Sequence, residues 1–177
     1  MKEIKLISTK TKDLKRKQLI AVCRLKNSFW PWTMSNQVRW FKKNIKAEDL
    51  NNLLFFENKL IGYTCLRKRK FYQEKKECDY YYFDAFLIKK QKRNFGFGKI
   101  LMNFNIKILK NLRSKSFLLT ELKNIEYYKK YKWKLLNNSK FNLLDHKPAW
   151  FKKKDQIFAM IFGKWDLRSK ISIYLNK

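Results

Sequence analysis

Glycine and proline are the scarcest structure-directing residues of this chain, with four glycines and two prolines in 177 residues. Average usage would supply about a dozen glycines in a chain of this length. No Pro-, Gly- or Ser-rich linker divides the sequence and no internal repeat occurs, so a single domain over residues 1–177 is expected. A glycine that remains in such a sequence should stand where no side chain fits.

Cysteine and histidine are too few and too scattered for a metal centre. Cys23, Cys65 and Cys78 form no CxxC pair, and His146 is the sole histidine. We therefore expect no metal cofactor and a reducing, cytoplasmic location. A lone histidine in a polar loop is expected to face solvent rather than to act in catalysis. The N-terminus lacks the apolar core of a signal peptide, and no apolar stretch is long enough to predict a transmembrane segment.

Acidic residues are also scarce, and they leave a formal net charge of +29 and a pI of about 10.1. One interpretation is an anionic partner such as nucleic acid. The other is compositional drift, since a strongly AT-biased coding sequence also yields many Lys, Asn, Ile, Phe and Tyr residues. Surface charge bears on association and not on fold, so both interpretations stay open, and a homodimer is compatible with the sequence. The hydrophobic content of 45% predicts a folded core.

Hydrophobic periodicity predicts an α/β fold with eight strands and four helices. The long segment Lys68–Asp79 is expected to be a charged turn, and residues 137–154 a loop region. Ser35 is expected to cap the second helix, and Leu101, Phe104, Ile108 and Leu112 to share the buried face of the third. The expected strands are 4–7, 53–57, 60–66, 80–88, 117–120, 133–136, 157–162 and 171–175, and the expected helices are 11–26, one beginning at Ser35, 98–113 and 125–131.

Two of the four glycines lie one residue apart, at Gly96 and Gly98, between an apolar strand and a helical pattern. A strand, a glycine loop and a helix start commonly hold a phosphate group. A nucleoside-triphosphate loop is disfavoured because Ile100 stands where Ser or Thr must bind magnesium. A dinucleotide-binding loop is disfavoured because Leu101 replaces its third glycine.

The residues around the glycines form the pattern Arg-x-x-Gly-x-Gly over Arg93–Gly98. Downstream, Tyr127–Trp133 is similar to a Tyr-x-x-x-Gly-Phe segment, with Lys132 in place of the glycine. Upstream, Glu57–Tyr63 is similar to a β-hairpin with a strand glycine, Gly62. Together, over roughly residues 53–136, these motifs resemble the GCN5-related N-acetyltransferase (GNAT) superfamily. The resemblance implies a mixed, mostly antiparallel central sheet flanked by helices, and acetyl-CoA or another acyl-CoA as co-substrate.

The resemblance also implies roles for particular residues. Tyr128 matches the tyrosine beside the CoA sulfur and is the candidate general acid, although a core or surface tyrosine is the alternative. Backbone amides near Leu87 and Ile88 would receive the acyl carbonyl and pantetheine. Asn124 would hold pantetheine, unless it only caps the following helix. The pyrophosphate would be wrapped by Arg93, Asn94, Phe95, Gly96, Phe97, Gly98 and Lys99.

Asp84 interrupts an otherwise apolar strand, so it could take a proton from the acceptor amine or orient its ammonium; a lysine partner or solvated residue is equally compatible. Trp30, Trp32 and Trp40 lie where the family lines its acceptor pocket, and helix-packing core is the alternative. The basic runs 67–70, 129–132 and 152–154 are expected to be solvated faces.

The sequence thus predicts an N-acetyltransferase that moves an acyl group from acyl-CoA to a primary amine of a small molecule, such as an amino sugar, or of a protein. One alternative keeps the fold and places the acceptor on RNA, for instance an aminoacyl-tRNA. Another is a non-enzymatic basic nucleic-acid-binding protein in which Gly96 and Gly98 form only a structural turn.

Overall fold

The computed structural model describes residues 3–145 and 157–176 and has a mixed α/β fold, in which helices flank a mostly antiparallel open sheet. The predicted fold class is therefore confirmed. The chain divides into two compact units, each described here by itself. The first comprises Met1–Arg67 and Phe83–Lys107, and the second comprises Lys68–Tyr82 and Ile108–Lys177. The two longest strands, β3 (Lys59–Gln73) and β4 (Lys76–Ile88), contribute residues to both units.

The sheet of the first unit begins with β1 (Ile4–Lys10) and β2 (Leu50–Phe56), which pair antiparallel, and β2 then pairs antiparallel with β3. The β2–β3 register shifts so that Leu54 faces Gly62 and Phe55 faces Leu60, which leaves Ile61 as the extra residue of a bulge. A Cβ at Gly62 would lie 2.9 Å from Ile88 Cδ1. The glycine therefore allows a close approach inside the sheet, in line with the expectation that a glycine of this chain stands where no side chain fits.

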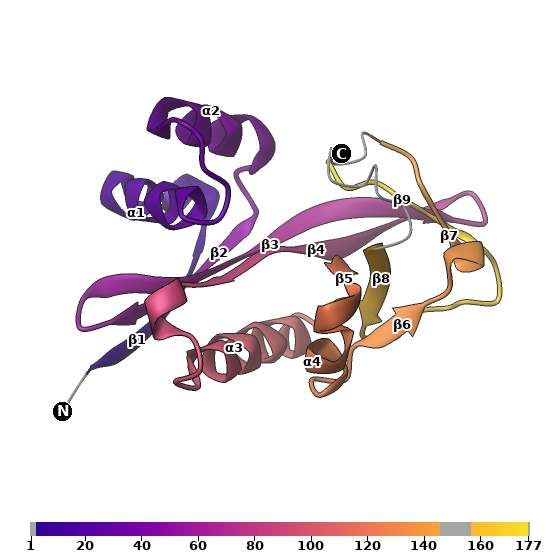
Figure 1. Ribbon diagram of the computed structural model, residues 1–177. Helices are drawn as coiled ribbons and strands as arrows, with labels where there is room; N and C mark the ends of the chain where they lie inside the picture. The colour runs from indigo at the N-terminus through magenta and orange to yellow at the C-terminus, as the bar shows by residue number, and fades with distance from the viewer. Residues whose placement is uncertain (1–2, 146–156, 177) are drawn as a thin grey trace. The chain divides into compact units, whose positions relative to one another are not determined.

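Two short helices, α1 (Arg16–Asn27) and α2 (Met34–Asn44), lie on one face of this sheet, and α3 (Phe97–Asn111) lies on the other face (Figure 1). Successive side chains of β2 point to opposite faces of the sheet. Leu53 packs in the cluster with α1 and α2, and Leu54 packs in the cluster with α3. Single turns precede α1 and α3, at Thr11–Asp13 and Lys90–Lys92. No helix in the described part of the chain has the length and hydropathy needed to cross a membrane.

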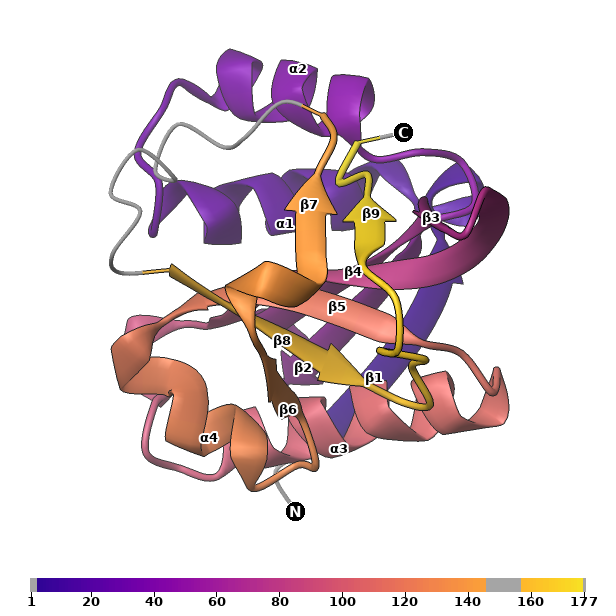
Figure 2. The ribbon, with the colours of Figure 1, turned by 90° about the vertical axis from the view of Figure 1, so that its right-hand side faces the viewer.

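In the second unit β5 (Ser116–Glu121) pairs parallel with β4, and β8 (Ile157–Phe162) pairs antiparallel with both β5 and β6 (Lys134–Leu136). The short strands β7 (Phe141–Leu143) and β9 (Ile171–Ile173) lie side by side and parallel (Figure 2). The helix α4 (Ile125–Lys129) and the single turns Leu122–Asn124 and Asn138–Lys140 complete the unit. Its core is largely aromatic and includes Phe71, Tyr80, Phe117 and Phe141.

The predicted charged turn over Lys68–Asp79 was wrong, because the chain continues as β3 to Gln73, turns at Glu74 and Lys75, and returns as β4 from Lys76. Cross-strand ion pairs compensate the charges of this hairpin: Lys70 Nζ lies 2.8 Å from Asp79 Oδ1 and 3.1 Å from Glu77 Oε1. The expectation that Arg67–Lys70 form a solvated face was wrong for two of the four residues. Arg67 and Arg69 are buried, and Arg69 Nε donates to the Leu175 carbonyl at 3.2 Å.

Two predicted helix details also differ from the structure. Thr33 rather than Ser35 caps α2, because its Oγ1 accepts from the Asn36 backbone N–H at 3.2 Å. Leu112 is 45% exposed and lies beyond the end of α3, whereas Met102, Asn105 and Leu109 are fully buried beside Leu101. Because Asn105 is buried and Leu112 is exposed, the buried face of α3 differs from the face that Leu101, Phe104, Ile108 and Leu112 would define. Residues 137–154 were expected to be a loop region, yet they include the short strand β7.

Candidate functional site

The connection between β4 and α3 places a set of backbone donors at a helix start. Gly96 adopts φ +78° and Asn94 adopts φ +66°, both in the left-handed region. The Gly96 carbonyl accepts the first α3 hydrogen bond, from the Ile100 N–H at 3.1 Å. Helix geometry therefore leaves the N–H groups of Gly96, Phe97, Gly98 and Lys99 without intrahelical acceptors. A Cβ built on Gly96 would meet no atom within 4 Å, so the space beside these donors is open.

The loop is held in place from both sides. Arg93 Nε donates to the Ile88 carbonyl at 3.3 Å, and its guanidinium lies 5.1 Å from the centre of the Phe29 ring. Phe97 is buried and packs edge-on against Phe56 at 5.1 Å between centroids. Phe95, in contrast, is 71% exposed. The donors are thus anchored to packed residues, and the helix dipole together with Arg93 and Lys99 favours an anion in the open space.

The end of β4 carries the other sequence-predicted residues of the first unit. Leu87 and Ile88 are buried and face opposite sides of the sheet, Leu87 towards the cluster with α1 and Ile88 towards the cluster with α3. The Lys89 N–H donates to the Ile61 carbonyl at 2.8 Å. Two residues before Leu87, Ala85 adopts φ +56°, which side chains disfavour. The extended backbone conformation is therefore interrupted near the end of the strand.

Asp84 forms an ion pair with Arg67, whose Nη1 lies 3.1 Å from Asp84 Oδ2. The Arg67 side chain is only 4% exposed and that of Asp84 is 23% exposed. Arg67 Nη2 also donates to the Asn44 carbonyl at the end of α2, at 3.1 Å. The sequence left open whether Asp84 acts on the acceptor amine or is a solvated residue or the partner of a lysine. The structure shows a basic partner, which is Arg67 rather than a lysine. The carboxylate is still accessible enough to meet a ligand.

A buried lysine, Lys26, belongs to α1, on the face of the sheet that α1 and α2 cover. Lys26 is 5% exposed, and its Nζ lies 3.4 Å from the centre of the Trp40 ring. Burial lowers the pKa of Lys26, and the charge of Asp84 partly offsets that effect. Trp40 packs against the core shared with α1 and α2, whereas Trp30 and Trp32 are 47% and 55% exposed. The three tryptophans therefore divide into one core residue and two surface residues.

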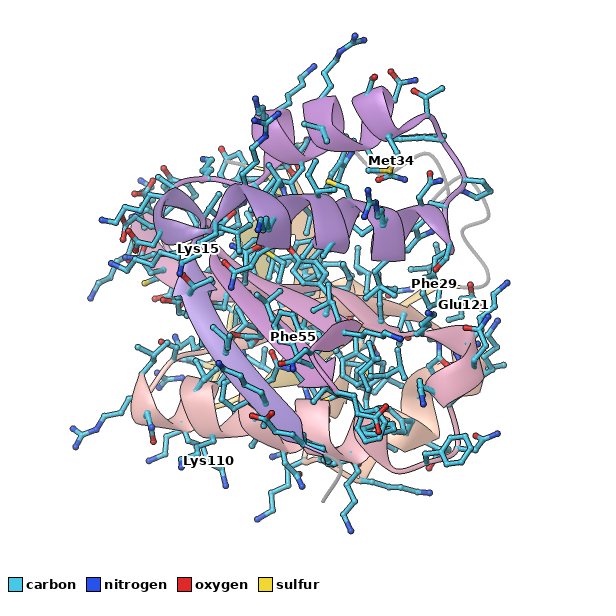
Figure 3. All side chains as sticks on the ribbon, turned by 90° about the vertical axis from the view of Figure 1, so that its left-hand side faces the viewer. Lys15, Phe29, Met34, Phe55, Lys110 and Glu121 are labelled. Carbon is cyan, nitrogen blue, oxygen red and sulfur yellow. The ribbon has the colours of Figure 1, made fainter. Side chains whose placement is uncertain are left out.

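The connection between α1 and α2 orders these exposed rings. Figure 3 labels Phe29 beyond the C-terminal end of α1 and Met34 at the start of α2. Gln37, which is buried, donates from Nε2 to the Trp30 carbonyl at 2.7 Å. The Trp32 N–H donates to Asn27 Oδ1 at 2.7 Å. The exposed rings thus belong to a loop whose backbone is fixed by hydrogen bonds.

Tyr128 and Asn124 belong to the second unit. Tyr128 is half-buried on α4, packs against the Trp133 ring at 6.1 Å, and has its pKa raised by burial. Its phenol therefore keeps its proton at neutral pH, as a proton donor must. Asn124 does occupy the N-cap position of α4, but its side chain makes no capping hydrogen bond. His146 lies outside the described residues, and the described residues contain no group of His, Cys, Asp and Glu that could hold a metal ion.

Several residues of these surroundings had no signal in the sequence. Ala85 is not a residue type that marks positive φ, so its conformation could not be foreseen. Lys26 and Arg67 occur among many other basic residues, and nothing in their spacing distinguishes a buried cation from an exposed one. The apolar residue Leu66 directly before Arg67 was the only available hint.

Comparison with known proteins places the chain in a family. Residues 19–133 match the model of the acetyltransferase (GNAT) family. The comparison with curated proteins finds no match. Among solved structures, Escherichia coli ElaA is similar with a TM-score of 0.65 and 10% identity, over 90% of this chain and 99% of that one.

Two further structures share the fold. An acyl-CoA N-acyltransferase from Pseudomonas aeruginosa has a TM-score of 0.64 and 13% identity, over 90% of this chain and 99% of its own. Arabidopsis thaliana Naa50, solved in complex with the bisubstrate analogue CoA-Ac-MVNAL, has a TM-score of 0.62 and 15% identity, over 91% of this chain and 99% of its own. At these identities the likeness concerns the fold.

Proposed function

The chain belongs to the acetyltransferase (GNAT) family, and we propose on that premise that it transfers an acyl group from acyl-CoA to a primary amine. The acceptor would be an amine of a small molecule, such as an amino sugar, or of a protein. The observation that carries the proposal is the open space at the start of α3, where Gly96 has φ +78° and a Cβ added to it would meet no atom within 4 Å. A pyrophosphate is the anion that such a cradle of helix donors suits.

The donor would be held by the residues of the β4–α3 connection. The N–H groups from Gly96 to Lys99 would bind the pyrophosphate, and Arg93 and Lys99 would add charge-assisted hydrogen bonds. The irregular strand end around Ala85 supports a role for the backbone near Leu87 and Ile88, where the acyl carbonyl and pantetheine would bind.

The reaction would be a direct attack of the amine nitrogen on the thioester carbonyl. The acceptor ammonium first releases one proton to solvent, and the neutral amine attacks. The C–N bond forms, the C–S bond breaks, and the departing thiolate takes a proton from the Tyr128 phenol, while the proton that the new amide nitrogen loses returns through solvent to the Tyr128 phenolate. Asp84 would orient the acceptor ammonium, since its carboxylate is 23% exposed and is held in place by the ion pair with Arg67 at 3.1 Å. Asn124 would contact pantetheine, since its amide is not used as a cap.

A pair of glycine variants tests the donor site. Gly96→Ala should weaken CoA binding by at least tenfold in calorimetry, because its Cβ occupies the open space and the positive φ disfavours alanine. Gly163→Ala is the matched control, since Gly163 also has positive φ, at +91°, but its added Cβ would meet the Ser114 carbonyl within the second unit. The control should lose stability and keep its CoA affinity. Absence of CoA binding in the wild-type protein would refute the proposal.

A second pair tests the proton donor. Tyr128→Phe should lower kcat by about a hundredfold or more, the usual contribution of a general acid, with CoA affinity unchanged. Tyr131→Phe, in the same segment, should leave kcat close to the wild-type value. Equal kcat values for the two variants would remove Tyr128 from the mechanism while leaving the CoA site intact.

A further inference from the structure

The acidic residues are unevenly distributed along this basic chain. No Asp or Glu occurs in residues 14–47, which contain nine Lys and Arg residues, or in residues 85–120, which contain another nine. All 14 acidic residues lie in the remaining segments. Compositional drift lowers the number of acidic residues throughout a chain and does not by itself exclude them from two particular segments.

They meet in a hollow of the first unit with a volume of about 350 Å³. Its lining comes from α1 and the residue that follows it, from the start of β3 and from the residues that follow β4. In the described part of the chain, no acidic side chain forms an ion pair with any of its four cations. The lining residues are Ala21, Arg24, Leu25, Ser28, Lys59, Leu60, Lys89, Lys90 and Gln91.

Exposed aromatic rings occur in the loop that continues the chain from Ser28 of this cationic hollow. Trp30 and Trp32 follow Ser28 closely in the chain and are 47% and 55% exposed. Their loop is fixed by the hydrogen bonds of Gln37 and Asn27, and the ring of Phe29, the residue directly before Trp30, lies 5.1 Å from the guanidinium of Arg93. Two large aromatic side chains presented to solvent on an ordered backbone mark an interaction surface.

We propose that this surface binds single-stranded nucleic acid, with phosphates in the hollow at Arg24, Lys59, Lys89 and Lys90 and with bases stacked on Trp30 and Trp32. Cationic grooves combined with exposed aromatic rings are the usual means of binding a single strand. An acidic peptide would use the cations but not the paired tryptophans. An anionic bilayer would require a protruding apolar surface, whereas here the cations line a concavity. The proposal goes beyond acyl transfer and does not depend on it.

The test measures the binding of a fluorescent oligouridylate RNA by anisotropy over a range of salt concentrations. The variant with Arg24, Lys59, Lys89 and Lys90 all changed to Gln should bind more weakly and with a shallower salt dependence, by about 0.7 in slope for each phosphate that is no longer neutralised. The control carries the same change of charge at four exposed lysines outside the hollow, Lys107, Lys110, Lys134 and Lys140. The control should keep the wild-type slope. Equal reductions in the two variants would overturn the proposal, because the binding would then reflect net charge alone.

The tryptophans are tested separately. Trp30→Ala with Trp32→Ala should weaken binding of the RNA roughly five- to a hundredfold per stacked base, while the double change to Phe should retain most of the affinity. Thermal unfolding of each variant verifies that it is folded. Binding of anionic phospholipid vesicles without binding of the oligonucleotide would overturn the proposal in favour of a membrane surface.

CoA calorimetry separates this surface from the donor site. The four-glutamine variant should bind CoA with the wild-type affinity if the hollow serves nucleic acid. Loss of CoA affinity with unchanged RNA binding would assign the hollow to CoA and overturn the proposal. Failure of Gly96→Ala to affect CoA would refute the donor site and leave the nucleic-acid surface standing.

Discussion

The interiors of the two units are built from different kinds of side chain. In the first unit, polar and charged groups are buried among the apolar ones, whereas the core of the second unit is dominated by aromatic and branched aliphatic residues. Among the described residues, the buried polar side chains of the first unit are Lys26, Gln37, Asp49, Asn51, Asn52, Thr64, Arg67 and Asn105, and those of the second are Arg69, Ser116 and Thr120.

Several of the buried polar groups of the first unit form hydrogen-bonded pairs. Asn52 Nδ2 donates to Asn105 Oδ1 at 2.7 Å, and Tyr63 OH donates to Asn51 Oδ1 at 2.8 Å. Such pairs add little net stability but fix side-chain positions, because breaking one leaves an unsatisfied buried group. The two interiors therefore differ in what holds them together: oriented hydrogen bonds contribute in the first unit, and apolar packing dominates in the second.

The largest decrease in the free energy of unfolding should follow from creating a cavity in the aromatic core of the second unit. Phe117 is fully buried, and its ring lies 5.7 Å from Phe141 and 6.2 Å from Tyr80. Phe117→Ala should lower the free energy of unfolding by about 3–5 kcal/mol, measured by urea denaturation. The control Leu122→Ala, at a position 66% exposed in the same unit, should change it by less than about 0.5 kcal/mol. A decrease below about 1 kcal/mol at Phe117 would contradict the assignment of the packing to this core.

A smaller effect is expected from the polar network of the first unit. Asn105→Ala removes the acceptor of Asn52 and should cost about 1–3 kcal/mol, since the amide of Asn52 is left buried without that partner. Asn103→Ala is the matched control on the same helix, where the side chain is exposed and alanine is the better helix former. It should be neutral or slightly stabilising. If Asn105→Ala were as mild as its control, the network would not order this interior.

The same contrast explains which features could be predicted from the sequence. The strands of the second unit are short apolar runs, and Ile157–Phe162 was predicted with the observed bounds. The glycine loop could be found because glycine is so rare in this chain that its position carries information. The phosphate-binding role of the loop and the role of Tyr128 stay predictions until CoA binding and turnover are measured.

The features that escaped prediction depend on tertiary interactions of charged or polar groups. The hairpin through residues 68–79 was missed because lysines that suggest a turn are compensated across the strands by Asp79 and Glu77. The face of α3 was misplaced because Asn105, polar in sequence, is buried through its bonds to Leu101 and Asn52. A hydrophobicity pattern cannot predict either feature, because it considers each residue without its interaction partner.

The smallest expected change in the free energy of unfolding concerns Ala85 of the first unit, which has φ +56°. Alanine-to-glycine changes in a strand usually cost about 0.5–1 kcal/mol, and Ala159→Gly, in the buried strand β8, should lower stability by at least that amount. Ala85→Gly should be close to neutral in denaturation, because glycine relieves the left-handed strain, worth about 1–2 kcal/mol, that φ +56° imposes on alanine. An equal decrease at the two positions would show that Ala85 is not strained. A near-neutral Ala85→Gly would locate strain at the strand end that precedes the glycine loop, which is where a structure that trades stability for a binding site is expected to store it.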